Sequence, residues 1–313
     1  PHVVASTSSR IVARTISSTC PAWHMGHHTP DRSELPPPAH HHDVKGGGGG
    51  GAALIVGAGD ALGTALAQKF AQQGLTACVV RRDAAKLYTL KMEIEGLPLL
   101  VHDHDHDHDN SHDHNNTKYC KCETFPADAR QEDQMQQVVE RIEATVGPIE
   151  VAVHNIGANV RYSILDAEMN ANKYFKVWEM AALSAFILGR AVATKMQARK
   201  RGTLLFTGAS ASLRGSSHFG AFSGAMFAKR ALAQSMAREL GPQGIHVAHV
   251  VIDGGIQTEF VKGILGEERF QQGVEKDALL RPDAIAENYW QLHQQPRVAW
   301  THELDLRPWV EKW

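Results

Sequence analysis

Several residue types and patterns are scarce in this chain, and each scarcity excludes a class of protein. The four cysteines, Cys20, Cys78, Cys120 and Cys122, are too scattered for the disulfide framework of a small secreted domain. No continuous apolar run reaches the ~18 residues of a membrane span. The net charge is only −2 and no basic stripe is present, so neither nucleic acid nor an anionic membrane is an expected partner. These absences favour a globular protein with free thiols.

Acidic residues are absent from residues 1–30, which hold Arg10, Arg14 and many Ser and Thr. This composition is typical of an organelle transit peptide, for which we expect the mitochondrion, with the cytoplasm as the alternative. An extension without a targeting role is an equally open interpretation. Residues 31–51 contain prolines and a glycine run typical of a linker. We therefore expect residues 1–51 to be a disordered extension before the folded domain.

From Ala52 onward, short apolar runs alternate with segments of helical periodicity. The expected strands are 52–56, 76–80, 122–125, 149–153, 204–207 and 247–252, and the expected helices are 62–73, 84–94, 132–145, 171–199 and 222–240. Strands that alternate with helices in this way form parallel sheets covered on both faces. The sequence therefore predicts one α/β domain over residues 52–313, with a doubly wound parallel sheet of the Rossmann type.

Residues 101–116 interrupt this alternation with an insertion rich in His and Asp. Both are metal ligands by type, and Cys120 and Cys122 follow closely. Strict alternation over a loop fixes no coordination geometry, however. We therefore favour a hydrated insertion with adventitious zinc or nickel affinity and assign no metal ligand. Metal storage or sensing by this segment is kept as a lesser hypothesis.

A glycine-rich turn, Val56–Gly63 (VGAGDALG), joins the first expected strand to the first expected helix. Glycines at such a turn let a pyrophosphate approach the helix N-terminus, where unpaired N–H groups favour an anion. On this turn and its setting, residues 52–258 resemble the short-chain dehydrogenase/reductase family, whose turn reads Thr-Gly-x-x-x-Gly-x-Gly. Ala61 departs from that pattern at the middle glycine. The resemblance implies cofactor contacts at Gly57, Gly59, Asp60, Leu62 and Gly63.

Arg81 and Arg82 end the second expected strand, where an acidic residue would bind the ribose hydroxyls of NAD. Guanidinium groups at that place suit the 2′-phosphate of NADP, so we expect NADP(H) in preference to NAD(H). A pair of solvated surface arginines is the alternative. The resemblance adds cofactor contacts at Asp128, at Asn155 and Gly157 of an Asn-Asn-Ala-Gly-like segment, and at Thr258.

The four positions that carry catalysis in the family hold no suitable functional group in this chain. By the resemblance, its Asn, Ser, Tyr and Lys correspond to Ala181, Ala209, Phe222 and Met226. The Tyr supplies an acidic proton and the Lys lowers its pKa, which Phe and Met cannot do. The catalytic residues therefore stay unassigned. Among neighbouring side chains we consider Lys229, expected to point partly away, and His218, expected in a surface loop.

Two hypotheses on function follow. The first is a divergent NADP(H)-binding oxidoreductase that turns over a carbonyl or alcohol substrate slowly. The second is a catalytically inactive pseudoenzyme that acts as a cofactor sensor or as a scaffold subunit of a larger assembly, such as an organellar one. The aromatic tail, 286–313, resembles that of a divergent branch of the family and either packs on its own domain or lies at an interface or cleft. The resemblance also implies a homo-oligomer.

Overall fold

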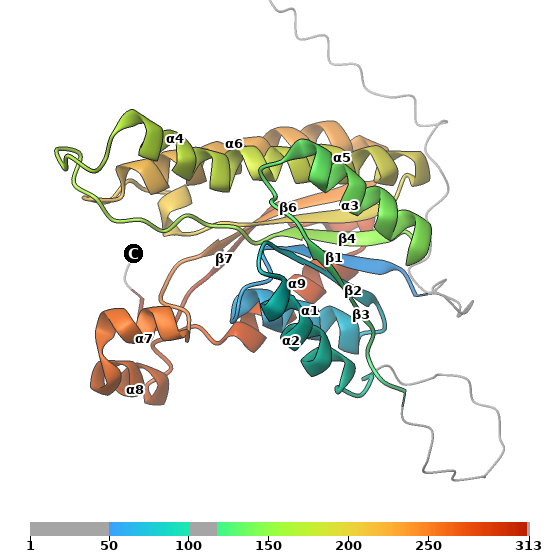
Figure 1. The fold of residues 1–313 in the computed structure, drawn as a ribbon, viewed down its shortest axis with the longest axis horizontal. Coiled ribbons are helices and arrows are strands. Elements are labelled where there is room, and N and C mark those ends of the chain that lie inside the picture. The colour runs from blue at the N-terminus through green and yellow to red at the C-terminus, as the bar shows by residue number, and fades with distance from the viewer. Residues whose placement is uncertain (1–49, 101–117, 312–313) are drawn as a thin grey trace, which may run out of the picture. The chain divides into compact units, whose positions relative to one another are not determined.

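A sheet of parallel strands forms the centre of this protein, in a computed structural model that describes residues 50–100 and 118–311 (Figure 1). The strands are β1 (Ala52–Val56), β2 (Thr76–Arg81), β3 (Cys122–Pro126), β4 (Ile149–His154), β5 (Gly202–Thr207), β6 (Ile245–Ile252) and β7 (Glu303–Leu306). Their order is β3-β2-β1-β4-β5-β6-β7, and every adjacent pair is parallel. The order reverses its direction of growth between β1 and β4, as expected of a doubly wound sheet.

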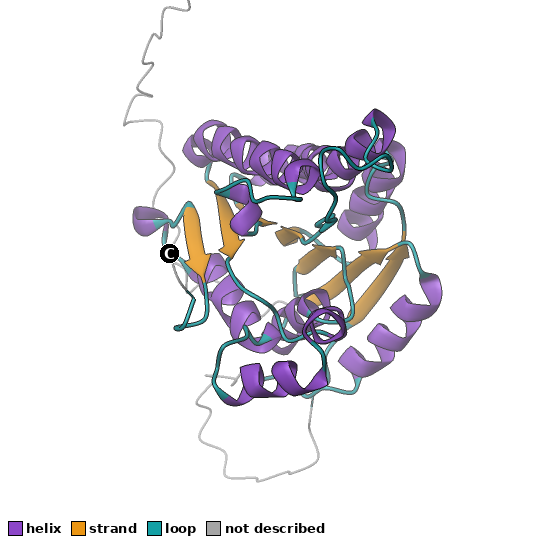
Figure 2. Ribbon diagram, turned by 90° about the vertical axis from the view of Figure 1, so that its left-hand side faces the viewer, coloured by secondary structure: helices purple, strands orange, loops and turns teal. Residues whose placement is uncertain are grey.

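Helices cover both faces of this sheet (Figures 1 and 2). Their bounds are α1 (Leu62–Gln72), α2 (Ala84–Glu95), α3 (Glu132–Thr145), α4 (Ala171–Trp178), α5 (Ser184–Arg199), α6 (Gly220–Leu240), α7 (Glu259–Leu265), α8 (Glu267–Glu275) and α9 (Pro282–Gln294). In Figure 1, α3, α5 and α6 lie above the sheet, and α1, α2 and α9 lie below it. The predicted α/β class and Rossmann-type sheet are confirmed.

The central strands are apolar along their whole length because both of their faces are covered. Successive side chains of a strand point to opposite faces. Leu54 accordingly packs with Met135 and Leu188 of the upper helices, whereas Ile55 packs with Leu66 and Phe70 of the lower ones. These two apolar cores fix the strands, and thereby the loops that follow the carboxyl ends of the strands.

One long helical stretch, Ala171–Arg199, comprises α4, a π-helical turn (Glu179–Leu183) and α5. Within the described ranges, it is a candidate membrane span by length and composition alone, with a mean hydropathy of 1.3. However, 61% of its apolar window is buried inside the fold. Burial of this kind is typical of a core helix, so the stretch is only weak evidence for a membrane span.

The C-terminal part of the chain adds elements that the apolar pattern did not predict. Helix α9 packs against α1 and buries Tyr289 and Leu292, and β7 extends the sheet beside β6. The exposed Trp309 donates from its indole nitrogen to the carbonyl of Lys276. Most of the described tail therefore packs on its own domain. Residues 1–49, 101–117 and 312–313 lie outside the described part, and with them the His/Asp insertion and all but the last two residues of the predicted extension.

Candidate functional site

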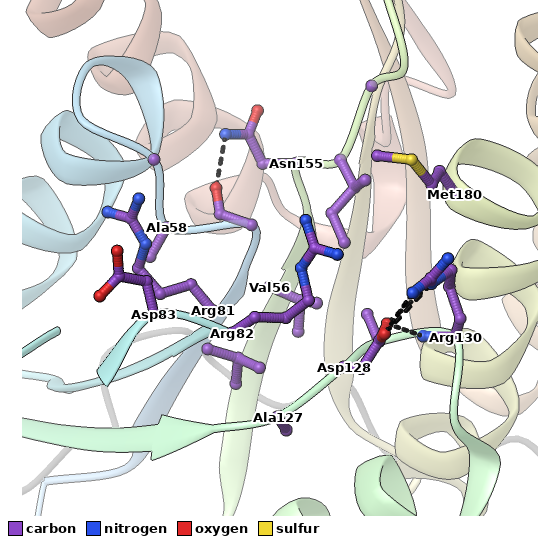
Figure 3. A pocket seen from close by; sticks show the side chains of 16 residues that line it. Val56, Ala58, Arg81, Arg82, Asp83, Ala127, Asp128, Arg130, Asn155 and Met180 are labelled. Carbon is purple, nitrogen blue, oxygen red and sulfur yellow. Dashed lines mark hydrogen bonds and ion pairs between the residues drawn. The ribbon is translucent and has the colours of Figure 1, made fainter. Parts of the chain in front are cut away.

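A cavity of about 670 Å³ opens at the carboxyl ends of β1 to β4, where the sheet order reverses (Figure 3). Its walls come from the turn after β1, the end of β2, the segment after β3, the loop after β4 and the π-helical turn. The lining residues are Val56, Gly57, Ala58, Gly59, Val80, Arg81, Arg82, Asp83, Ala127, Asp128, Ala129, Arg130, Asn155, Ile156, Gly157 and Met180. The size is ordinary for a small-molecule site, and in open α/β sheets ligands bind at this reversal point.

Seven of the residues expected from the sequence to contact a cofactor line this cavity, namely Gly57, Gly59, Arg81, Arg82, Asp128, Asn155 and Gly157. Four others do not line it. Leu62 is buried in the apolar core, and Gly63 packs against the backbone of the turn. Asp60 is paired with Arg81 and Lys86. Thr258 caps α7, where its hydroxyl accepts a hydrogen bond from the Val261 amide.

The glycines of the turn have different physical roles. Gly57 has φ +90°, and a Cβ there would lie 2.7 Å from the carbonyl oxygen of Asn155. The Asn155 amide group donates back to the Gly57 carbonyl at 3.1 Å. A Cβ on Gly63 would lie 2.6 Å from that same carbonyl, whereas one on Gly59 meets no atom within 4 Å. Gly57 and Gly63 therefore allow close backbone packing, and the surface at Gly59 is open to a ligand.

The two arginines at the carboxyl end of β2 differ in their partners, with Arg81 the last residue of the strand and Arg82 directly after it. Arg81 Nη1 lies 2.6 Å from Asp60 Oδ1, and Lys86 Nζ lies 2.8 Å from Asp60 Oδ2. Hydrogen bonds from Lys86 and then Arg81 lower the pKa of Asp60. Arg82 is exposed and makes no ion pair with any described residue, and in Figure 3 its side chain extends into the cavity. Arg82 is thus the guanidinium that is free to bind an anion.

Asp128 is held by Arg130 on the opposite wall of the cavity. Arg130 Nη2 lies 2.5 Å from Asp128 Oδ2, and its Nε lies 3.0 Å from Asp128 Oδ1. These hydrogen bonds lower the pKa of Asp128, so the carboxylate stays ionised. A fork of this kind fixes the acceptor geometrically. The carboxylate therefore faces a ligand in one orientation.

All four positions that correspond to the family's catalytic residues come together in one apolar cluster. Ala181, Phe222 and Met226 are buried in it, and Ala209 packs against it. The Phe222 ring edge would lie 3.9 Å from a Cβ on Gly157, so the ring packs close to the loop after β4. Hydrocarbon thus fills the space where hydrogen-bonding groups would act.

The π-helical turn, Glu179–Leu183, is a backbone feature that also indicates a functional site. Ala181 lies at its centre, and Met180 reaches the cavity wall. Single π turns inside α-helices occur frequently at functional sites. The backbone distortion is therefore present although Ala181 offers no polar side chain.

Lys229 is buried in α6, which sequence reasoning did not predict. Its Nζ donates to the carbonyl oxygens of Ile156 at 2.6 Å and Thr207 at 3.1 Å. The spacing of α6 contains the missed signal, because Phe222, Met226 and Lys229 share the i, i+4, i+7 face that is buried. A lysine on that apolar face needs polar partners for its amine, and here these are the two backbone carbonyls.

Two histidines, His154 of β4 and the sequence candidate His218, make structural contacts. His154 is fully buried, and its Nε2 lies 2.8 Å from the Ser184 hydroxyl. His218 is exposed in the loop before α6, where its carbonyl accepts from the Tyr162 amide. In the described ranges, no group of three or more His, Cys, Asp or Glu side chains is arranged to hold a metal ion.

The sheet order, the glycine turn and the cavity at the reversal point define a Rossmann-type dinucleotide-binding fold. A family model described as enoyl-(acyl carrier protein) reductase matches residues 85–291, which is more than half of the chain. A solved short-chain dehydrogenase from Rhodopseudomonas palustris is 38% identical, with 83% of this chain and 99% of that chain covered and a TM-score of 0.64. This chain belongs to the short-chain dehydrogenase/reductase family.

More distant proteins are similar to this chain as well. A metagenomic short-chain oxidoreductase in complex with NADP is 21% identical, with 84% of this chain and 99% of that chain covered and a TM-score of 0.65. The 3-dehydrosphinganine reductase of Danio rerio is 24% identical over 62% of this chain and 53% of its own length. The 3-oxoacyl-[acyl-carrier-protein] reductase MabA of Mycobacterium avium is 26% identical over 47% of this chain and 55% of its own. The chain thus matches about half the length of these reductases.

Proposed function

We propose that this protein binds NADP(H) and is an oxidoreductase for a carbonyl or alcohol substrate, with turnover slowed by the loss of the family's catalytic set. The observation that carries this proposal is the cavity at the sheet reversal, which is lined both by the open turn at Gly59 and by Arg82, an arginine that forms no ion pair with the described residues. Relatives whose names describe reductases support the reaction class.

The residues of the cavity fit the parts of a dinucleotide. The amides of the turn and the N-terminus of α1 suit the pyrophosphate. Arg82 suits the 2′-phosphate that distinguishes NADP from NAD, because a guanidinium binds phosphate through paired hydrogen bonds. Asp128 presents a fixed acceptor for an adenine amino group. Asn155, anchored to the Gly57 carbonyl, shapes the loop on the nicotinamide side.

A bound nicotinamide would supply or accept the hydride. The chain's own contribution is then binding, orientation and exclusion of water, because Phe222 and Met226 offer neither a proton nor a charge. General acid–base help contributes typically ~10²–10⁴-fold to a rate. We therefore expect turnover slower than that of a complete site by about that factor.

The substrate has an apolar part under this proposal. The segment after β4 exposes Ile164 (76%) and Leu165 (90%), and α7, after β6, exposes Phe260 (59%) and Ile264 (66%). Both segments leave the carboxyl edge of the sheet, the edge at which the cavity opens. Large exposed apolar side chains on segments that leave this edge favour a ligand with an apolar part.

Titration of the full chain with NADPH and with NADH, followed by nicotinamide fluorescence, tests the cofactor. Micromolar binding with preference for NADPH supports the proposal and justifies a screen of carbonyl substrates. No binding of either cofactor at millimolar concentration contradicts it.

The second candidate is a pseudoenzyme that senses NADP(H) or serves as a scaffold. The specific observation in its favour is that the four family positions are filled by one apolar cluster. Tight NADPH binding without turnover of any carbonyl in the screen favours the sensor, and absence of binding favours the scaffold.

Assembly and location are further parts of the proposal. Phe186 on α5 and Phe227 on α6 are 43% and 41% exposed, which suits a homo-oligomer that pairs through these helices. Light scattering on the purified chain measures its mass in solution. The composition of residues 1–30 supports a mitochondrial location, which imaging of residues 1–51 fused to a fluorescent protein tests.

A further inference from the structure

Lys229 connects three elements around the inner end of the cavity. It is carried by α6, and its Nζ bonds to Ile156 in the loop after β4 and to Thr207 at the end of β5. Ile156 stands between Asn155 and Gly157 on the cavity wall. Thr207 precedes Gly208 and Ala209, the segment of the family's catalytic serine. One amine therefore holds both loops that border the reacting end of the site.

This amine has no carboxylate partner within the described part of the chain. Both of its hydrogen bonds go to backbone carbonyls, and the side chain is completely buried. A buried ammonium group is costly unless paired, so burial lowers the pKa of Lys229 to about 7. The group consequently changes between its charged and neutral forms near neutral pH.

The titratable groups around Lys229 do not neutralise it. On β4, burial and then the charge of Lys229 lower the pKa of His154, which bonds to Ser184 of α5. On β6, burial lowers the pKa of His249 to about 4. Glu303 on β7 bonds to His249 and is paired with Arg230 at 2.6 Å.

The remaining neighbour is Tyr289 on α9, whose hydroxyl bonds to the Thr207 hydroxyl at 2.8 Å. Burial raises the pKa of Tyr289, so this phenol stays neutral. With both histidines and the tyrosine uncharged at neutral pH, Lys229 is the group in this cluster whose charge changes there.

We propose that Lys229 is a positioning residue: its ammonium group holds the loops at Ile156 and Thr207 in the cofactor-binding conformation and holds them less firmly once its proton is lost. A charged donor makes hydrogen bonds roughly twice as strong as a neutral one. The inference rests on the proposed function, since it concerns the same cavity. The positive charge that the family carries at position 226 thereby lies three residues later, on the same buried face of α6.

The test measures dissociation constants of NADPH and NADH for the full chain from about pH 6 to about pH 9. For wild type, affinity for both cofactors falls about threefold to tenfold as the pH rises, as expected from weaker hydrogen bonds. NADH serves as the check because it lacks the 2′-phosphate, which titrates near pH ~6. The direction also separates the two effects, because ionisation of that phosphate strengthens binding to Arg82.

Two variants remove the charge. Lys229→Met leaves both carbonyls without a donor, and Lys229→Gln keeps a neutral donor of similar reach. We expect both to bind the cofactors more weakly than wild type at about pH 6 and to lose the pH dependence. The matched control is Lys176→Met on the exposed side of α4, which should keep the wild-type profile. A wild-type pH profile in the Lys229 variants overturns the inference.

A cofactor-free measurement separates this inference from the proposed function and from simple loss of folding. The backbone N–H of Asn155 donates to the Val56 carbonyl, and the backbone N–H of Gly208 donates to the Val250 carbonyl. Hydrogen exchange at these two backbone amides therefore reports on the two loops. In wild type their protection, relative to amides of α3, falls as the pH passes about 7. Constant relative protection overturns the inference, even if no variant folds. Failure of folded wild type to bind either cofactor contradicts the proposed function instead.

Discussion

Arg81 Nη1 lies 2.6 Å from Asp60 Oδ1, so the arginine that ends β2 is already paired, whereas the adjacent Arg82 forms no ion pair with the residues that the structure describes. These two adjacent arginines therefore differ in their contacts. Arg81, with Lys86, anchors the glycine-rich turn through Asp60, and Arg82 lines the cavity, where we propose that it binds the 2′-phosphate. The pairing refines the sequence interpretation, in which both arginines were expected to contact the 2′-phosphate.

Replacement of Arg82 should therefore separate the two cofactors. We expect Arg82→Ala to weaken NADPH binding about 10- to 100-fold, in keeping with ~1.5–3 kcal/mol for a hydrogen bond to a charged group. NADH binding should change little, because it has no 2′-phosphate. Paired fluorescence titrations measure both constants. An equal loss of affinity for NADPH and NADH would show that Arg82 shapes the cavity and does not bind the 2′-phosphate.

Removal of Asp60 gives the converse experiment. Asp60→Ala frees Arg81 and removes a negative charge beside the expected phosphate. We expect NADPH affinity to rise up to about fivefold, since an exposed ion pair contributes only ~0–1 kcal/mol. The gain should shrink at high salt, which screens exposed charges. A drop in affinity would mean that the turn needs the Asp60 anchor more than the site needs a second guanidinium.

The glycines of the turn allow a matched pair of variants. Gly57→Ala places a Cβ 2.7 Å from the Asn155 carbonyl at φ +90°, and should lower the free energy of unfolding by about 1–3 kcal/mol. Gly59→Ala meets no protein atom within 4 Å and should leave stability unchanged. If the pyrophosphate passes over Gly59, the Gly59→Ala variant should lose cofactor affinity while its stability stays unchanged. Denaturant unfolding and NADPH titration of both variants decide this.

Restoring the family's catalytic pair tests whether the site is merely incomplete. In Phe222→Tyr with Met226→Lys, the new phenol and amine would stand on the buried face of α6. We expect reductase activity to rise, by up to the ~10²–10⁴-fold that general acid–base help contributes. Single-variant and double-variant rates are compared at saturating NADPH, with thermal unfolding to show that the new lysine is tolerated. No gain in a folded, cofactor-saturated double variant favours the pseudoenzyme.

Much of the fold follows from local sequence, for identifiable reasons. Strand β1 (AALIV) is apolar at every position because helices cover both faces, and this pattern is visible without any structure. Strand β7 (ELDL) lies at the edge and is half polar, so it gives no such signal. Helices α7 and α8 span only 7 and 9 residues and bury none of them, so no long apolar stripe marks them in the sequence. Helix α9 did carry a signal, with Pro282 in its first turn and Ile285, Tyr289 and Leu292 on one face.

The site was predictable to a similar, partial degree. The glycine turn, Asn155 and Gly157 come together because they follow neighbouring strands. The Asp60–Arg81 pair joins residues far apart in the sequence, and its geometry depends on how α1 and β2 are placed. The two carbonyls that receive the Lys229 amine belong to two different loops, and no linear pattern specifies such a meeting.

Burial of Lys229 also makes stability depend on pH. Its pKa is about 7 in the fold and near the ordinary lysine value when unfolded, so the unfolded chain binds more protons between these values. The free energy of unfolding should therefore rise with pH across this window, by at most about 1.4 kcal/mol per pH unit. Below about pH 7 both states are protonated and the contribution is flat.

Lys229→Met should remove this slope, while Lys176→Met, at an exposed lysine, should keep it. Urea unfolding of the three proteins between about pH 7 and about pH 9 measures the difference directly. A slope that persists in Lys229→Met would assign the titration to another group. A slope that is lost there, together with weaker cofactor binding at low pH, would mean that the charge costs stability and is retained for the site, as expected where a buried group serves function.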